Sequence, residues 1–155
     1  MGRGAASHPT EAERGAGVSA FIDTNILIRH LTGDPPDLAA RATRFLQEAD
    51  ELLLPDLILA EVVYVLESFY EVPRDRVAEI ARTILAFDTI TIVDRDLLLR
   101  AIELYEVDRL DFADAYLVVS AEVTGVGVVA SFDQAIGRRR THRPAMEPPD
   151  GPGHI

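Results

Sequence analysis

Four acidic residues occupy positions where a carboxylate could do chemistry. Two directly follow short apolar runs typical of buried strands, and two lie among apolar residues at helical spacing. In that order they are Asp23, Asp133, Glu61 and Asp114. Carboxylates brought together repel one another, so such a cluster is best explained by a hard divalent cation with oxygen ligands, Mg²⁺ or Mn²⁺. A cation held in this way can activate water for attack on a phosphodiester.

Each acid also has a purely structural interpretation. Asp23 and Asp133 could cap the helical turns behind them, because Asp is a preferred N-cap residue. Glu61, expected on a buried helix face, could form an ion pair with one arginine. Asp111, three residues before Asp114, is explained equally well as a helix N-cap and as a metal-site carboxylate. All four acids occurring in one short chain favours the metal site.

The composition excludes several kinds of chemistry. No cysteine occurs among the 155 residues, which excludes thiolate metal sites and thiol nucleophiles and fits a reducing cytoplasm. No lysine occurs either, which excludes Schiff bases, P-loops and the phosphoacceptor site of signalling receiver domains. The net charge of −11 repels nucleic acid, so any binding to it needs a local basic patch or bound metal ions. No apolar run is long enough to span a membrane.

The elements that must position these acids alternate between strands and helices. Strands are predicted up to Ile22 and at 52–54, 89–93 and 126–130, and helices at 26–31, 37–48, 56–70, from Pro73, from Asp94 or Asp96, and at 111–124. This alternation predicts an α/β domain of three layers, with a parallel sheet of four to five strands between helices. Because ligands bind beyond the carboxyl ends of parallel strands, Asp23 and Asp133 are expected at one edge of the sheet.

The composition also sets the expected boundaries. Residues 1–17 contain no large apolar residue after Met1, so a disordered extension is expected there. The folded domain is expected at 18–146, and a flexible tail at 147–155. The proline-rich end leaves room for at most one edge strand, near Ala145 and Met146.

Four short motifs carry a resemblance to a known family. They are Ile22-Asp23-Thr24-Asn25, Ala60-Glu61 within 57–66, Asp111-Phe112-Ala113-Asp114-Ala115 and Ser131-Phe132-Asp133. Together they resemble the four acidic motifs of PIN-domain ribonucleases, and their spacing is most similar to the VapC-type toxins of bacterial toxin–antitoxin pairs. Each motif alone is weak, but all four in order between Val18 and Arg139 are a specific signal.

The resemblance implies a sheet in the order 3-2-1-4-5 and endonucleolytic cleavage of RNA that depends on Mg²⁺ or Mn²⁺. By position, Asp23, Glu61 and Asp114 would be the metal ligands, and Asp133 a fourth acid that acts directly or through water. Residues that match the polar positions orienting these acids are Thr24, Asn25 and Ser131. The motif leaves the role of Asp111, a further acid near them, open.

The resemblance also implies partners. These are a second copy of the chain and an antitoxin whose tail blocks the cleft. The basic residues Arg138, Arg139 and Arg140 could contact RNA phosphates or an acidic antitoxin tail, or could simply be a solvated helix end. The alternative function is a catalytically silent module of the same fold that acts by holding a protein partner.

Overall fold

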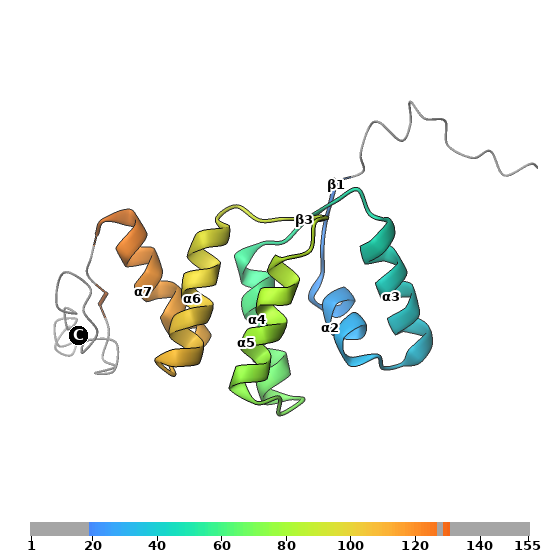
Figure 1. The fold of residues 1–155 in the computed structure, drawn as a ribbon, viewed down its shortest axis with the longest axis horizontal. Helices are drawn as coiled ribbons and strands as arrows, with labels where there is room; N and C mark the ends of the chain where they lie inside the picture. Colours follow the sequence, from blue (N-terminus) through green and yellow to red (C-terminus); the bar gives the residue numbers. More distant parts are fainter. Residues whose placement is uncertain (1–18, 127–128, 131–155) are drawn as a thin grey trace, which may run out of the picture. The chain divides into compact units, whose positions relative to one another are not determined.

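The structure is a computed structural model, and it describes residues 19–126 and 129–130 (Figure 1). The chain divides into two compact units. The first comprises Met1–Leu54 and Asp88–Thr91 and is called the sheet unit. The second comprises Pro55–Phe87 and Ile92–Ile155 and is called the helical unit.

The sheet unit contains a parallel sheet of three strands in the order β1-β2-β3. The strands are β1 (Ser19–Phe21), β2 (Glu51–Leu53) and β3 (Ile90–Thr91). Leu52 lies in the central strand opposite Ala20 on one side and Ile90 on the other, and it is completely buried. This apolar pairing is limited to one row across the sheet, because Ser19, Glu51 and Thr91 are polar and Phe21 of β1 is 74% exposed.

The observed strand order agrees with the predicted order as far as it can be compared. Read from β3 to β1, it is the 3-2-1 part of the predicted order 3-2-1-4-5. Residues 127–128 of the predicted fourth strand lie outside the described residues, although Ala130 forms a bridge. The edge strand expected near Ala145 and Met146 also lies outside them.

Two helices complete the described part of the sheet unit, and they pack side by side (Figure 1). They are α2 (Thr24–Thr32) and α3 (Pro36–Glu48). Helix α2 ends at Gly33, which takes the left-handed conformation with φ of 71°, and the Gly33 N–H bonds to the carbonyl of Arg29. Between the helices, His30 Nδ1 and Thr43 Oγ1 are 2.8 Å apart.

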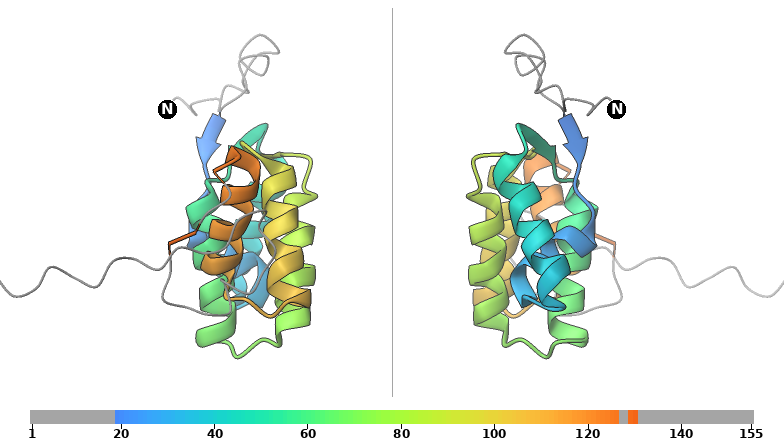
Figure 2. Two further views of the ribbon diagram at one scale, coloured as in Figure 1. Left: turned by 90° about the vertical axis from the view of Figure 1, so that its left-hand side faces the viewer. Right: turned by 90° about the vertical axis from the view of Figure 1, so that its right-hand side faces the viewer.

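The helical unit is built from four described helices of 12 or 13 residues each. They are α4 (Asp56–Ser68), α5 (Arg74–Leu85), α6 (Arg95–Val107) and α7 (Phe112–Thr124). Consecutive helices pack against each other, α6 and α7 most extensively, and α7 also contacts α4 (Figure 2). Gly125 ends α7 in the left-handed conformation, which agrees with the helix predicted at 111–124. None of the helices described is long and apolar enough to cross a membrane.

The start of α6 offers a direct test of helix capping. Of the two residues from which the sequence predicts this helix to begin, Asp94 is the N-cap, because its Oδ1 accepts a hydrogen bond from the Leu97 N–H at 3.0 Å. We expect Asp94→Ala to lower the free energy of unfolding by about 1 kcal/mol in urea titrations. Asp96→Ala, in the same turn but without this bond, should change it by less than about 0.5 kcal/mol. Equal losses in the two variants would contradict the capping role.

Candidate active site

Asp23 stands at the carboxyl end of β1, where the chain leaves the sheet. The Ile22 N–H still bonds to the Leu53 carbonyl at 3.0 Å, and Thr24 is already the first residue of α2. Asp23 occupies the N-cap position, but its side chain makes no capping hydrogen bond. Its carboxylate is exposed and has no hydrogen bond or ion pair with another described residue. The capping interpretation of this side chain is therefore wrong, and the carboxylate has no visible structural task.

The two polar residues after Asp23 differ in their surroundings. Thr24 is buried, the one polar residue among the described positions to be so. Asn25 is exposed and lines a pocket between α2 and α3. The motif assigns Thr24 and Asn25 the role of orienting Asp23. The buried hydroxyl of Thr24 and the exposed amide of Asn25 are compatible with that role.

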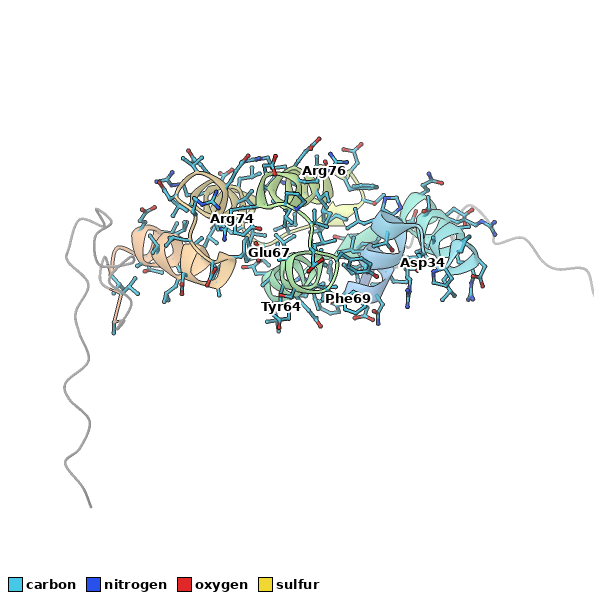
Figure 3. The ribbon with its side chains drawn as sticks, turned by 90° about the horizontal axis from the view of Figure 1, so that it is seen from below. Asp34, Tyr64, Glu67, Phe69, Arg74 and Arg76 are labelled. Carbon is cyan, nitrogen blue, oxygen red and sulfur yellow. The ribbon has the colours of Figure 1, made fainter. Side chains whose placement is uncertain are left out.

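Glu61 lies on α4, but not on the face that the sequence predicts. The buried side chains of α4 are Leu59, Val62, Val63 and Leu66. Glu61 is exposed, and its neighbours at helical spacing, Leu57 and Tyr64, are 77% and 67% exposed; Tyr64 points outward in Figure 3. The prediction that Glu61 is buried was wrong because α4 is apolar nearly all round, so that spacing alone does not identify its buried stripe. The proposed role of Glu61 as a metal ligand therefore depends on the motif and not on burial.

Asp114 and Asp111 lie at the start of α7. Asp114 is half-buried in the first turn, where the helix dipole favours a negative charge. Further along the helix, Val118 and Ala121 are buried, whereas Leu117 is 45% exposed. Asp111 takes the N-cap position without a side-chain capping bond, and its Oδ1 lies 3.9 Å from Nη2 of Arg74.

Arg74 holds the start of α7 in place. Its Nη1 donates hydrogen bonds to the carbonyls of Tyr105 at 2.8 Å and Leu110 at 2.6 Å, at the end of α6 and in the loop before α7. The guanidinium carbon lies 4.3 Å from the centre of the Tyr105 ring. Nη2 lies 4.0 Å from a carboxylate oxygen of Glu67 on α4 (Figure 3). Sequence reasoning missed this residue, although it connects α4, α5 and α6 to the loop that carries Asp111.

Two tyrosines strengthen these connections within the helical unit. Tyr105 donates its hydroxyl to Glu67, and burial together with that carboxylate raises the pKa of Tyr105 above its ordinary value. Tyr116 donates to Asp56 Oδ2 at 2.7 Å, and this bond raises the pKa of Tyr116 as well. Both hydroxyls therefore stay protonated donors at neutral pH. The Tyr116 bond joins the first turn of α4 to α7, the helices that carry Glu61 and Asp114.

The predicted site residues are distributed over both units and the undescribed end of the chain. Asp23 belongs to the sheet unit, and Glu61, Asp111 and Asp114 belong to the helical unit. The remaining predicted residues, Ser131, Asp133, Arg138, Arg139 and Arg140, lie outside the described residues. Among residues 19–126 and 129–130, no group of three or more acidic or histidine side chains could by itself hold a metal ion. The gathering of the four acids stays a prediction.

Comparison with known proteins identifies the family. Residues 20–140 match the family model of the PIN domain. The chain belongs to the PIN-domain family. A VapC ribonuclease of Aquifex aeolicus (strain VF5) is 29% identical over 122 residues, which cover 77% of this chain and 87% of that protein. No solved structure matches the chain significantly.

These findings confirm the family that the four motifs predict. The three-layer α/β/α fold follows from membership of the PIN-domain family, and the parallel sheet of the sheet unit agrees with it. The similarity to a VapC ribonuclease extends over most of both chains, so it is not limited to one motif. Neither finding favours the catalytically silent module.

Proposed function

We propose that this PIN-domain protein is a metal-dependent endoribonuclease, the toxin of a type II toxin–antitoxin pair, acting in the cytoplasm. The observation that carries the proposal is Asp23, an exposed carboxylate at the carboxyl end of a parallel strand with no capping bond. A side chain in that place, without a structural task, is typical of a ligand-binding position in α/β folds. Membership of the PIN-domain family and the similarity to a VapC ribonuclease support the proposed chemistry.

The residues fit a hard cation by their donor chemistry. Asp23, Glu61, Asp114 and Asp133 would hold Mg²⁺ or Mn²⁺, because all four offer carboxylate oxygens, which these ions prefer. A bound divalent ion supplies an acidified water and neutralises charge on the phosphodiester. Thr24, Asn25, Asp111 and Ser131 would orient the acids by hydrogen bonding. Arg74 acts through the backbone, because it holds the loop that leads into α7, and Asp114 lies in the first turn of that helix.

The proposal includes an antitoxin and a second copy of the chain as partners. Glu61 lies between Leu57 and Tyr64, two large apolar side chains that are mostly exposed on α4. A partner peptide that covered these apolar groups would also cover Glu61, which supports inhibition by direct obstruction. Arg138, Arg139 and Arg140 are candidate contacts for RNA phosphates or for acidic residues of the antitoxin.

Metal removal tests the proposed chemistry. The purified chain is expected to cleave RNA with Mg²⁺ or Mn²⁺ and to leave 5′-phosphate and 3′-hydroxyl ends. EDTA should lower the rate by about 100-fold or more, and added Mn²⁺ should restore it. Cleavage that persists in EDTA would contradict the proposal. Calorimetry with Mn²⁺ distinguishes the nuclease from the catalytically silent module, because a silent module that has lost its metal site would not bind Mn²⁺.

A further inference from the structure

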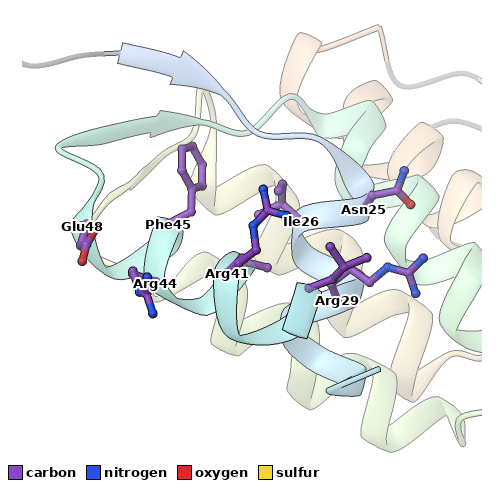
Figure 4. A pocket seen from close by; sticks show the side chains of 9 residues that line it. Asn25, Ile26, Arg29, Arg41, Arg44, Phe45 and Glu48 are labelled. Atoms are coloured by element: carbon purple, nitrogen blue, oxygen red, sulfur yellow. The ribbon is translucent and has the colours of Figure 1, made fainter. Parts of the chain in front are cut away.

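A pocket of about 630 Å³ lies between α2 and α3 in the sheet unit (Figure 4). Apolar side chains and three arginines line it. These three, Arg29, Arg41 and Arg44, are all the arginines that the structure describes in the sheet unit. One carboxylate, that of Glu48, also lines the pocket, so its walls keep an excess of two positive charges. This concentration of charge stands out in a chain of net charge −11.

The positive charges of this pocket are not neutralised by the described carboxylates. Arg41 and Arg44 are exposed and form no ion pair with any described residue. Arg29 donates to the backbone carbonyl of Asp34 at 2.8 Å, a bond that leaves its positive charge uncompensated. By contrast, Arg76 and Arg100 of the helical unit each pair with a glutamate three residues later. The pocket is therefore suited to an anionic ligand.

Two features indicate which anion fits. Arg41, Arg44 and Phe45 follow the spacing i, i+3, i+4, so they share one face of α3, and the Phe45 ring is 43% exposed. An exposed ring and guanidinium groups that line one pocket can stack a base and bind phosphates. At the other wall, Asn25 lines the pocket two residues after Asp23. The pocket therefore begins within two residues of the proposed cleavage site.

We propose that the pocket between α2 and α3 binds single-stranded RNA next to the scissile bond, with Arg41 and Arg44 on phosphates and Phe45 against a base. This inference depends on the proposed ribonuclease function. The pocket holds substrate in position, and it contributes no group to the bond-breaking step. An acidic peptide would also satisfy the arginines, but RNA is favoured because the pocket begins close to Asp23, where the proposed substrate is cut.

Binding of RNA in EDTA tests the inference without cleavage. The probe is a labelled oligouridylate of about 12 nucleotides, a length that a small domain can cover. Arg41→Ala/Arg44→Ala is expected to weaken binding about tenfold and to reduce the slope of log K against log salt by about 1.4, the effect of two phosphate contacts on a single strand. The matched control, Arg76→Ala/Arg100→Ala, removes the same charge and should weaken binding less than about twofold.

Phe45→Leu separates RNA from an acidic peptide, because leucine keeps the apolar contact but cannot stack. It should weaken oligouridylate binding about fivefold without changing the salt slope. Equal losses in the two arginine pairs, or unchanged binding in Arg41→Ala/Arg44→Ala, would overturn the inference. Oligoglutamate is tested in the same way. The inference would also be overturned if oligoglutamate bound through Arg41 and Arg44, if Phe45→Leu left that binding unchanged, and if oligouridylate showed no binding that depends on these arginines. Metal-dependent cleavage by the wild-type chain is measured separately. A failure of RNA binding at this pocket is therefore distinguishable from a failure of the proposed ribonuclease function.

Discussion

Asp23→Asn is expected to lower the rate of RNA cleavage by about 1,000-fold or more, while the protein stays folded. Asparagine keeps the shape of the side chain but loses the charge that a divalent cation requires. The stability should change by less than about 0.5 kcal/mol, because the carboxylate is exposed and caps no helix. Cleavage assays with Mg²⁺ and urea titrations of the same preparation measure the two effects independently.

Asp50→Asn is the matched control for this substitution. Asp50 is also an exposed aspartate of the sheet unit, located between α3 and β2 rather than at the carboxyl end of a strand. Its replacement removes the same charge and should leave the cleavage rate within about twofold of the wild type. Full activity of Asp23→Asn with metal present would contradict the proposal that this carboxylate is needed for RNA cleavage. Equal losses in both variants would show a general charge effect instead.

Arg74→Ala is expected to lower the free energy of unfolding by about 3 kcal/mol. The substitution removes donors from two backbone carbonyls, those of Tyr105 and Leu110, and it removes the cation over the Tyr105 ring. It also leaves Glu67 with the Tyr105 hydroxyl but without its arginine. Urea denaturation of the full chain measures the loss, which should appear in the midpoint with little change in slope.

The same helix supplies a control for Arg74. Arg76, two residues further along α5, forms only an exposed ion pair with Glu79, so Arg76→Ala should change stability by less than about 0.5 kcal/mol. Arg74→Lys keeps the charge but cannot reproduce the planar set of donors, and it should recover less than half of the loss. Stability of Arg74→Ala equal to that of Arg76→Ala would show that the contacts of Arg74 contribute nothing.

Features with a local cause were predicted well from the sequence. The ends of α2 and α7 follow from Gly33 and Gly125, which adopt positive φ without the steric cost of a side chain. The central strand follows from an apolar run that stops at Pro55. The place of Asp23 at the end of β1 was predicted for a similar reason, because the end of a strand and the residue after it can both be read from the sequence.

Two features that depend on distant parts of the chain were not predicted. The buried face of α4 is chosen by its neighbours in space, and an almost uniformly apolar helix gives no sign of that choice, which is why Glu61 was misplaced. Arg74 meets Tyr105 and Leu110 across separations of 31 and 36 residues, and a single arginine at a helix start has no pattern that marks such contacts. The gathering of the acids also depends on distant parts of the chain, but it was predicted from the four motifs together, and it stays a prediction.

The division of the sheet between two stretches of chain has a consequence for synthesis. The second edge of β2 is completed only by residues that come after α4 and α5, since the Leu52 N–H bonds to the Thr89 carbonyl and the Leu54 N–H to the Thr91 carbonyl. A nascent chain therefore leaves this edge open until Thr91 has emerged from the ribosome, and a product truncated before Asp88 never closes it. An unpaired strand edge promotes aggregation. Premature termination before Asp88 should thus yield a fragment that is prone to aggregate and that also lacks α6 and α7.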